Sequence, residues 1–528
     1  MKANPPISPA GAGTWLLRAA LLAAAAALLL PPVRSLFFAA GARWAYVLAL
    51  SFTIAALAAP LLRAVAWRVG ALDRPDGDAG RKIHDRPTAL FGGLAVWVGV
   101  VGALLANGVW PQGLAPVLAT ATLLMAFSAA DDLRPIGSSL KLTVFLVCSV
   151  LAVAAGARAT TFDQSPLGTV LNIVLSVVWI IGIFNSLNFL DGMDGLATGL
   201  SVIIAGFLGV VAFETAQPAL GWAAAAIAGA CLGFIPYNFR PGKRATMFLG
   251  DAGSNFLGFM LASLALLGYW ADADPLVAIS SPILIFSVLI YDMTYITLDR
   301  IASGKVRSFY EWIDYVGQDH LHHRVAAVLG GRAKAVVFIL MMSATLGIAA
   351  LGLRNATPGA AALLLLQAFL VLSLITMLER RGKGLLRGFF HAPPPAGSNP
   401  GRPPVLVVDF DNTIASPYGY PEIGKPIEGS RRFLRLLKNE GWKIIIYSCR
   451  SGAEHEAVMA KWLEENEIPF DEINRNSSYP WASGKPVGDV YLDDRGVRFE
   501  GRWDAAYQKV QELLHLEGPN LIGERTRR

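Results

Sequence analysis

Cysteine is nearly absent from this chain of 528 residues, which contains only three. Cys148 and Cys231 lie within apolar runs, and Cys449 lies near the C-terminus. No pair has the spacing of a disulfide or of a metal-binding motif, so a disulfide framework is not expected.

Charge is also scarce. Charged residues make up 16% of the chain and hydrophobic residues 54%, and the mean hydropathy is +0.48, a balance that soluble proteins rarely have. Long runs of Ala, Leu and Val instead indicate a helical protein that crosses a membrane several times. The formal net charge is +6. In a membrane protein we interpret this excess as a signal for loop orientation and not as nucleic-acid binding.

Twelve apolar segments follow one another, each near the ~20 residues that cross a bilayer as a helix. Because the backbone must satisfy its own hydrogen bonds in lipid, these segments are expected to be helices. The sequence therefore predicts a polytopic α-helical membrane protein with 11–12 transmembrane helices, followed by a small soluble α/β domain. The segments are 14–31, 45–67, 90–109, 114–130, 140–156, 167–187, 196–213, 219–236, 254–269, 276–298, 333–352 and 360–378.

Basic residues are distributed unevenly between the loops. The loops after odd-numbered segments contain only Arg34, Arg43, Arg158 and Arg354. The positive-inside rule therefore places the even loops and the C-terminal tail in the cytoplasm. The even loops and the start of the tail contain Arg74, Arg81, Lys82, Arg86, Arg134, Arg240, Lys243, Arg244, Arg300, Lys305, Arg307, Arg324, Arg332, Arg380, Arg381, Lys383 and Arg387.

The first segment has a second interpretation, as the core of a signal peptide. Ala40-Gly41-Ala42 resembles a small-residue cleavage site, whereas Arg34 and a ten-residue gap argue against cleavage. Removal of this segment would leave eleven spans in the same orientation.

The composition changes after residue 387. Residues 388–402 are rich in Pro and Gly and indicate a linker between a membrane domain (1–387) and a C-terminal domain (403–528). Apolar runs typical of strands, at 405–408, 443–447 and 490–492, then alternate with helical patterns at 429–440 and 453–466. This alternation predicts a small α/β domain with a parallel sheet.

Polar residues interrupt the apolar segments most strongly at 185–195, which read NSLNFLDGMDG. Asp191 and Asp194 are three residues apart, a spacing that lets two side chains share one helical face. Gly192 and Gly195 allow the backbone to bend or a ligand to approach closely. Ionised carboxylates at the edge of hydrocarbon are costly and usually mark a functional site. An ordinary polar helix end is the alternative.

Four further polar clusters fall in the even loops, on the same predicted side. Convergence of all five would join carboxylates with Lys, Arg and His, which suits a divalent cation that bridges a diphosphate. Taken singly, each cluster has an alternative: Asp131-Asp132 as a solvated helix end, the basic residues of 81–86 as a topology signal, 250–253 as a plain turn, and the His run as a zinc site. The four clusters are 81–93, Asp131-Asp132 with Lys141, 238–254 and 319–324.

The motifs in these clusters resemble those of the polyprenyl-phosphate N-acetylhexosamine-1-phosphate transferases, the WecA/MraY superfamily of glycosyltransferases (family 4). The resemblance covers the chain to about residue 378. It implies transfer of a sugar 1-phosphate from a UDP-sugar to undecaprenyl phosphate, with release of UMP and dependence on Mg²⁺, or alternatively Mn²⁺. The matching motifs are RPT at 86–88 with Gly92-Gly93, Asp131-Asp132, 185–195, FLGDAGS at 248–254 and HLHHR at 320–324.

The resemblance also implies roles for single residues. Asp251 is the expected Mg²⁺ ligand, Asp131 with Asp132 the base or phosphate-activating pair, and Lys141 a contact of the lipid phosphate. A phosphate monoester is already largely ionised near neutral pH, so the lipid phosphate needs positioning more than deprotonation. The other expected site residues are Asp191, Asp194, His322, His323 and Arg324 in catalysis, and Arg86, Asn185, Asn188, Arg240 and His320 in substrate binding.

The His motif departs from that of the peptidoglycan branch, which has three consecutive His residues followed by Tyr-Glu. Here Leu321 interrupts the run and Arg324 follows it. This difference favours a small UDP-N-acetyl sugar over UDP-MurNAc-pentapeptide, without choosing GlcNAc over FucNAc or QuiNAc. The product would begin a lipid-linked glycan such as O-antigen, capsule or a cell-wall polymer.

The C-terminal domain has its own acidic motif, DFDNT at 409–413, directly after a predicted strand. Parallel-sheet enzymes place their chemistry at this end of the strands. Residues 403–515 resemble the haloacid dehalogenase-like (HAD-like, Rossmannoid) phosphatases. That resemblance implies Asp409 as nucleophile and metal ligand, Asp411 as general acid/base, Ser448 and Lys485 as phosphate contacts, and Asp493 and Asp494 as Mg²⁺ ligands.

Other readings of the whole chain stay open at this point. A secondary transporter with a regulatory tail would place polar groups near the middle of the membrane, whereas here the acidic groups lie at segment ends. The tail is either catalytic or a docking module, and a homodimer is left open. The expected partners are undecaprenyl phosphate, a UDP-N-acetyl sugar and the bilayer, with no nucleic acid.

Overall fold

The chain divides into two compact units, Met1–Leu385 and Leu386–Arg528. Their structure is a computed structural model that describes residues 12–73, 87–134 without 109 and 111, 136–270, 275–353 without 305, 307–310 and 312–318, and 356–390. In the second unit it describes 404–493 without 417–421, 428, 440, 451, 478–485 and 489. Each unit is considered separately below.

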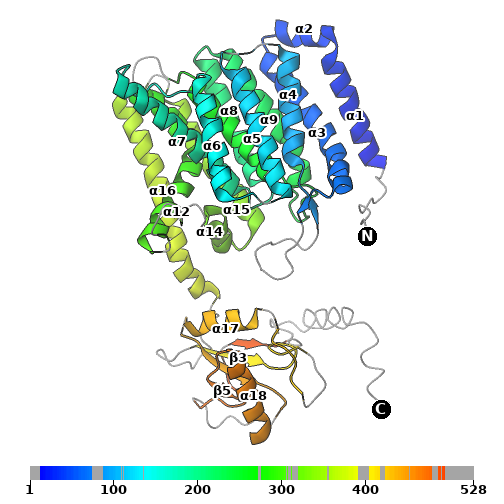
Figure 1. The fold of residues 1–528 in the computed structure, drawn as a ribbon, viewed down its shortest axis with the longest axis vertical. Helices are drawn as coiled ribbons and strands as arrows, with labels where there is room; N and C mark the ends of the chain where they lie inside the picture. Colours follow the sequence, from blue (N-terminus) through cyan, green and yellow to red (C-terminus); the bar gives the residue numbers. More distant parts are fainter. Residues whose placement is uncertain are drawn as a thin grey trace. The chain divides into compact units, whose positions relative to one another are not determined.

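The first unit is a bundle of helices with one short two-stranded sheet (Figure 1). The sheet pairs β1 (Leu72–Asp73) with β2 (Thr88–Ala89) in antiparallel register. The helices are α1 (Ala12–Leu29), α2 (Pro31–Ala39), α3 (Arg43–Val69), α4 (Gly92–Asn107), α5 (Leu114–Leu133), α6 (Ser138–Ala154), α7 (Pro166–Leu190), α8 (Leu196–Glu214), α9 (Pro218–Asn238), α10 (Gly250–Leu267), α11 (Pro275–Ile285), α12 (Ser287–Ala302), α14 (Leu321–Leu329), α15 (Arg332–Leu351) and α16 (Pro358–Phe390).

Every predicted apolar segment coincides with a helix or a helix pair, but fewer than twelve have the length and composition of a full span. Among the described residues, eight helices do, or up to ten if each of two bent pairs counts as one span. The bends of 72° between α1 and α2 and 79° between α11 and α12 were not predicted. The apolar helices α4 and α6, of 16 and 17 residues, are shorter than the spans.

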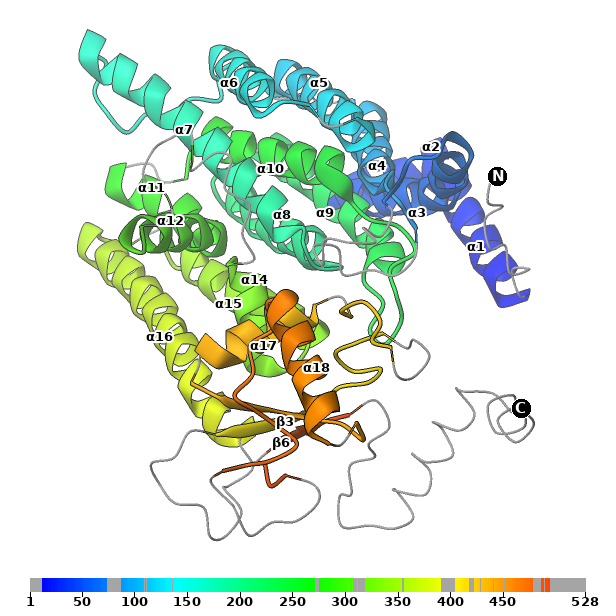
Figure 2. The ribbon, with the colours of Figure 1, turned by 60° about the horizontal axis from the view of Figure 1, so that its bottom comes forward.

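Helix α10 lies in the middle of the bundle and contacts α4, α5, α7, α8 and α9 (Figure 2). It is rich in small residues and is almost entirely buried, so its neighbours approach it closely. Because α5, α7 and α9 end near the place where α10 begins, their polar ends are brought to the same end of the bundle.

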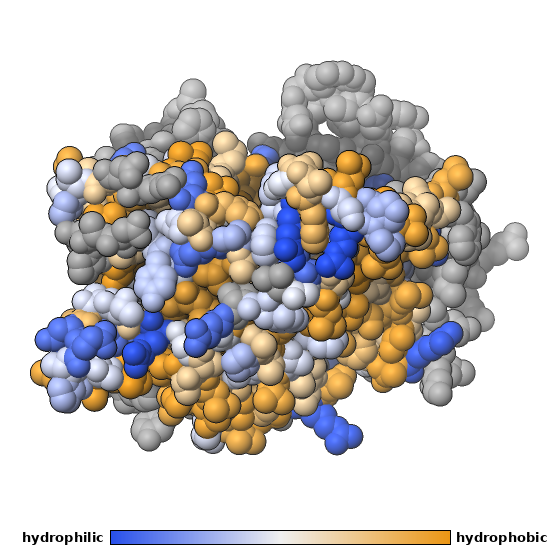
Figure 3. All heavy atoms as spheres, turned by 90° about the horizontal axis from the view of Figure 1, so that it is seen from above, coloured by the Kyte–Doolittle hydropathy of each residue, from blue (hydrophilic) through white to orange (hydrophobic). Residues whose placement is uncertain are grey.

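The outer helices present apolar side chains to their surroundings. In α16, Leu363, Leu366, Phe369 and Leu370 are more than 45% exposed, and α6 and α7 carry similar exposed residues. The end of the bundle that includes α2 shows polar residues interspersed with apolar ones, and apolar residues form much of the visible margin (Figure 3). Such extensive apolar surface on the sides of a bundle is expected for contact with lipid.

Two glycines form a close crossing between α4 and α10. A Cβ atom on Gly93 of α4 would lie 2.4 Å from both Cα and N of Gly253 in α10. The amides of Gly92 and Gly93 also donate to the carbonyls of Phe248 and Leu249, at 3.1 and 2.9 Å. The described part of the first motif, 87–93, and the 248–254 motif are therefore held together by backbone contacts.

Gly93→Ala is expected to destabilise the protein by about 1–3 kcal/mol, because the added methyl group meets backbone atoms that cannot move aside. The measurement is the Tm in detergent. Gly206→Ala in α8 is the control, since nothing lies within 4 Å of its Cβ position. Equal Tm values for the two variants would show that the crossing is looser than the structure indicates.

The second unit contains a four-stranded sheet of order β5-β4-β3-β6, with all neighbours parallel. Its strands are β3 (Val405–Asp409), β4 (Lys443–Tyr447), β5 (Glu472–Ile473) and β6 (Val490–Leu492), and its helices are α17 (Ser430–Asn439) and α18 (Ala453–Glu465). The predicted α/β pattern and parallel sheet agree with this structure, and only β5 was missed. Apolar residues of β3 and β4 form the core with α17 and α18.

Candidate active site

The 185–195 motif forms the turn between α7 and α8. Asp191 caps the C-terminus of α7, and Gly195 precedes α8 with φ +80°, a conformation that favours glycine. Asp191 and Asp194 therefore lie in a turn and not on one helical face, which corrects the expectation drawn from their spacing. The Gly195 amide donates to Oδ1 of Asn238 at 2.7 Å, and Nδ2 of Asn238 donates to the Met247 carbonyl.

The N-terminus of α10 brings carboxylates from three segments together. Nδ2 of Asn188 donates to Oδ1 of Asp251 at 3.0 Å and to Oγ of Ser254 at 2.9 Å. The Ala252 amide donates to Oδ2 of Asp132 at 3.3 Å. The positive end of the helix dipole thus faces a group of acidic side chains.

The predicted pair Asp131 and Lys141 is in direct contact. Nζ of Lys141 lies 2.5 Å from Oδ2 of Asp131, and the Ile136 amide donates to Oδ1 at 2.7 Å. The Lys141 side chain is about one-third exposed (32%), so the ammonium group remains accessible beside the acidic cluster.

Asp191 lies close to the other carboxylates. Burial raises the pKa of Asp191 well above its ordinary value, and the charges of Asp251, Asp132 and Asp194 raise it further, against a hydrogen bond from the Gly250 amide. Like charges gathered in one enclosed place are costly unless a cation offsets them. Ionised carboxylates here would therefore favour binding of a positive ion.

A complete protein cage for a metal is not present within the described residues, because no three His, Cys, Asp or Glu side chains are arranged to hold one. This arrangement still suits Mg²⁺, which usually keeps several waters and takes only one or two carboxylates together with substrate phosphates. Asp251 and the neighbouring Asp191 are candidates to hold such an ion.

The His motif lies against the same turn. The rings of Phe189 and His320 are 4.9 Å apart, and a Cβ atom on Gly192 would lie 2.6 Å from Nε2 of His322. His322 is 1% exposed, and neither of its ring nitrogens has a hydrogen-bond partner among the described residues. Burial lowers the pKa of His322 to about 2, so its ring is neutral at physiological pH. A neutral, unpartnered imidazole is suited to hydrogen bonding with a ligand.

The structure places the other predicted residues less favourably. Asn185 donates to the Ile181 carbonyl of its own helix at 2.8 Å, and Nη1 of Arg240 lies 3.5 Å from the Arg244 carbonyl in the 239–244 loop. Arg86 lies outside the described residues, as do Lys485 and Asp494 of the second unit.

Sequence reasoning missed two residues of this site, Asn238 and Asp292. Asn238 was seen only as the start of a cluster, although it links the 191–195 turn to the 247–253 segment. Asp292 lies within an apolar run and contacts the His motif. An ionisable residue inside a predicted span is itself a signal of function, and that signal was available.

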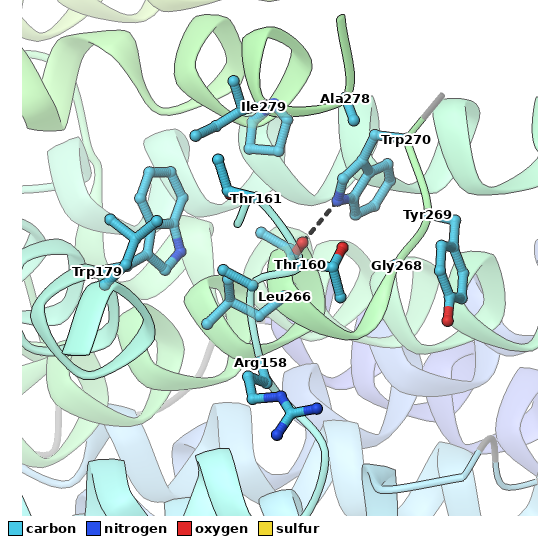
Figure 4. Close-up of a pocket in the computed structure, with 14 residues that line it drawn as sticks. Arg158, Thr160, Thr161, Trp179, Leu266, Gly268, Tyr269, Trp270, Ala278 and Ile279 are labelled. Carbon is cyan, nitrogen blue, oxygen red and sulfur yellow. Dashed lines mark hydrogen bonds between the residues drawn. The ribbon is translucent and has the colours of Figure 1, made fainter. Parts of the chain in front are cut away.

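A separate cavity of about 140 Å³ lies at the other end of α7 and α10 (Figure 4). Arg158, Trp179, Tyr269 and Trp270 are among its lining residues, and the Trp270 indole donates to the Ala265 carbonyl. None of the predicted site residues lines this cavity, so it does not belong to the acidic site.

In the second unit, the predicted residues of β3 and β4 meet at one edge of the sheet. Oγ1 of Thr413 donates to Asp409 at 3.3 Å, and Oγ of Ser448 donates to Asp411 at 3.1 Å. Arg450, which the sequence analysis did not select, donates from Nε and Nη2 to Asp411 at 3.0–3.1 Å. Asp493 follows β6 and is exposed.

Comparisons with known proteins agree with the site of the first unit. The model of "Glycosyl transferase family 4" matches residues 114–269. A probable undecaprenyl-phosphate N-acetylglucosaminyl 1-phosphate transferase of Bacillus subtilis is 31% identical over 56% of this chain and 81% of its own. A decaprenyl-phosphate N-acetylglucosaminephosphotransferase of Mycobacterium tuberculosis is 29% identical over 61% and 85%. A phospho-N-acetylmuramoyl-pentapeptide-transferase of a Synechococcus species is 34% identical over 42% and 68%.

Fold, site and comparisons define the class, a multi-pass bacterial membrane transferase. The chain belongs to glycosyl transferase family 4, the polyprenyl-phosphate hexosamine-1-phosphate transferases of the WecA/MraY type. The resemblance based on the five motifs is thereby confirmed for the membrane part of the chain.

Proposed function

We propose that the membrane unit transfers an N-acetylhexosamine 1-phosphate from a UDP-sugar to undecaprenyl phosphate and releases UMP. An oxygen of the lipid phosphate attacks the phosphorus that carries the sugar, and the bond from that phosphorus to the bridging oxygen breaks. UMP leaves with the bridging oxygen, and the lipid retains a diphosphate-linked sugar. This reaction begins a lipid-linked glycan.

The observation that carries the proposal is the meeting of Asp132, Asp191 and Asp251 beside the unpartnered ring of His322. These residues come from segments far apart in the sequence, yet Asp132 accepts from the α10 N-terminus, where Asp251 lies, and Gly192 contacts His322. The carboxylates and the histidine together suit a diphosphate that arrives with a divalent cation. The acidic groups lie at helix ends and not near the middle of the membrane, so they do not support the transporter alternative.

The residues divide into three groups by their expected roles. Asp251 and Asp191 would hold Mg²⁺, which when bound offsets the charge of the diphosphate. Lys141, beside Asp131, would receive the lipid phosphate, and His322, His323 and Arg324 would contact the donor. The neutral ring of His322 can donate to one phosphate oxygen without adding charge.

Mg²⁺ is expected to raise the Tm more in mildly alkaline than in mildly acidic buffer. The raised pKa of Asp191 means that its ionisation costs folding stability once the pH exceeds the ordinary pKa, and this cost grows until the pH reaches the folded-state value. A bound cation removes the cost, so its benefit is greater where Asp191 is ionised. Thermal unfolding with and without Mg²⁺ at both pH values measures the difference. If the increase in Tm caused by Mg²⁺ became smaller as the pH rises, the assignment of Asp191 to the metal site would be contradicted.

The donor is proposed to be a UDP-N-acetyl sugar without a peptide. Two of the relatives named above carry N-acetylglucosamine in their names, and one carries N-acetylmuramoyl-pentapeptide. Here Leu321 interrupts the His run, and it is buried. The test is purified protein with undecaprenyl phosphate and a panel of UDP-N-acetyl sugars, scored for UMP and lipid product. Turnover of UDP-MurNAc-pentapeptide alone would overturn this choice.

The site is proposed to face the cytoplasm, because the loops at its end of the bundle contain most of the basic residues of the membrane unit. In oriented vesicles, a cysteine introduced at Arg240 should react with a membrane-impermeant thiol reagent only from the cytoplasmic side. Labelling from the opposite side would reverse the topology.

For the second unit we propose a Mg²⁺-dependent phosphatase. Support comes from Asp409 and Asp411 at the end of β3 beside Ser448 at the end of β4, the arrangement that parallel-sheet enzymes use. Removal of UMP would pull the transferase reaction forward by mass action, since one phosphoanhydride is exchanged for another. A non-catalytic docking module is the competing reading.

Asp409→Asn in the full chain is expected to abolish phosphate release from UMP or sugar phosphates, because the nucleophile is lost. Asp251→Asn serves as the matched control, since it should remove the transferase activity and leave phosphate release unchanged. If the wild-type chain with Mg²⁺ releases no phosphate from these substrates, the docking module is the better account.

A further inference from the structure

A fully buried carboxylate in α12 contacts both the backbone and a side chain of the His motif. Asp292 is 0% exposed. Its Oδ1 accepts from the Leu321 amide at 2.7 Å, and its Oδ2 lies 2.9 Å from Nδ1 of His320. Both oxygens of one side chain are therefore engaged by two consecutive residues of the motif.

The same helix holds the motif at further points. Arg300 donates from Nε and Nη2 to the two oxygens of Asp319, at 2.9 and 2.7 Å. The guanidinium of Arg324 lies 4.2 Å from the centroid of the Tyr295 ring, and its Nη1 donates to the Asp319 carbonyl at 2.6 Å. Since residues 292, 295 and 300 lie near one face of a helix, α12 acts as the support of residues 319–324.

An ionised carboxylate can only accept hydrogen bonds. Because Oδ1 of Asp292 accepts from the Leu321 amide and Oδ2 faces Nδ1 of His320, the carboxylate selects the tautomer with the proton on Nδ1, in which Nε2 carries a lone pair. The hydrogen-bond partner of one ring nitrogen thus determines whether the other nitrogen carries a proton or a lone pair. Asp292 also satisfies the first amide of α14, so the direction of that helix and the place of His322 against Gly192 depend on it.

We propose that Asp292 is a positioning residue of the transferase: it fixes the tautomer of His320 and the start of α14, so that Nε2 of His320 accepts a hydrogen bond in the loaded site. The groups that donate to this nitrogen are hydroxyl or amide groups of the UDP-N-acetyl sugar. This inference rests on the proposed function of the membrane unit.

Asp292→Asn is the sharpest test, because it keeps the shape and reverses the hydrogen bond. The carboxamide oxygen still accepts from Leu321, whereas its NH₂ group donates to Nδ1 and forces the proton onto Nε2. A comparable Asp-to-Asn change beside a catalytic imidazole lowers kcat by about 10⁴ in serine proteases. For a positioning role outside bond making, we expect a loss in kcat of about 10²-fold with a change in KM below about threefold.

Two companion variants separate positioning from simple stability. Asp299→Asn, on the same helix, controls for loss of a carboxylate and should retain activity. In the double variant Asp292→Asn with His320→Gln, the loss should be no greater than for His320→Gln alone, because Asp292 acts through His320. Additive losses would show that Asp292 acts independently of the ring, and would overturn the proposal.

A further variant keeps the test decisive if Asp292→Asn lowers the Tm. His320→Asn retains a donor near the position of Nδ1 and lacks a group at Nε2. It should therefore keep the wild-type Tm and lose kcat about 10²-fold. Wild-type kcat in His320→Asn, or in a stable Asp292→Asn protein, would overturn the inference. Absence of the sugar-carrying lipid product with the wild-type protein would instead overturn the proposed function.

Discussion

Asp251→Asn is expected to lower the rate of UMP release by about 10³-fold or more, because it removes a charge from the centre of the acidic cluster. Asn has the same shape, and its carboxamide oxygen can still accept from Nδ2 of Asn188. The substitution therefore changes the charge of the site while it retains the local hydrogen bond.

The same variant should not unfold. Asp251 adds to the repulsion that raises the pKa of Asp191, so its neutral replacement is expected to leave the Tm of the metal-free protein unchanged or higher. Glu214→Gln, at the far end of α8, provides the control for loss of a carboxylate away from the site. Near-normal activity in Asp251→Asn would show that the metal and diphosphate bind elsewhere. A large fall in Tm would show that the carboxylate has a structural role.

Gly192→Ala is expected to lower kcat/KM by about 10²-fold, which is the effect of a misplacement near 1 Å at a site of this kind. The new Cβ atom would lie 2.6 Å from Nε2 of His322. Because His322 is 1% exposed and its ring is enclosed, the turn or the ring must shift. Either movement separates the carboxylates of the turn from the His motif.

Gly182→Ala in α7 is the matched control, since nothing lies within 4 Å of its Cβ position. It should retain activity and gain slightly in stability, as expected for Ala in place of Gly within a helix. A double-mutant cycle of Gly192→Ala with His322→Ala should be non-additive, because both changes act on one contact. Full activity in Gly192→Ala would show that this contact is not maintained in the working enzyme.

The sequence predicted the helices of the membrane unit well because their signal is strong. Apolar runs near the length of a span leave little choice but helix. The bend at α11–α12 was missed because the composition stays apolar through it. The bend at α1–α2 lies at Pro31-Pro32, a helix-breaking signal that was available in the sequence. Likewise, the strands and helices of the second unit followed from alternating patterns, whereas the two-residue β5 is too short to give one.

The sequence indicated which residues gather at the site better than it indicated how they are arranged. Spacing alone suggested a helical face for Asp191 and Asp194, but α7 ends at Leu190 and α8 begins only after Gly195, so both residues lie in the turn between the helices. Asn185 and Asn188 belong to the same motif. Asn188 donates to Asp251, whereas Asn185 donates to a carbonyl of its own helix. Arg450 was missed because its importance depends on Asp411, a partner brought near by the tertiary fold. The contact of Asp292 with His320 was hidden for the same reason, although the position of Asp292 within a predicted span was visible in the sequence.

The identity of the released nucleotide tests the central claim most directly. The Asp409→Asn protein, in which the proposed removal of UMP is abolished, is incubated with Mg²⁺, undecaprenyl phosphate and UDP-GlcNAc, and the nucleotide and lipid products are identified by mass spectrometry. Transfer at phosphorus predicts UMP together with an equal amount of lipid that carries one N-acetylhexosamine and one additional phosphate. Release of UDP, or of UMP without that lipid, would contradict the account.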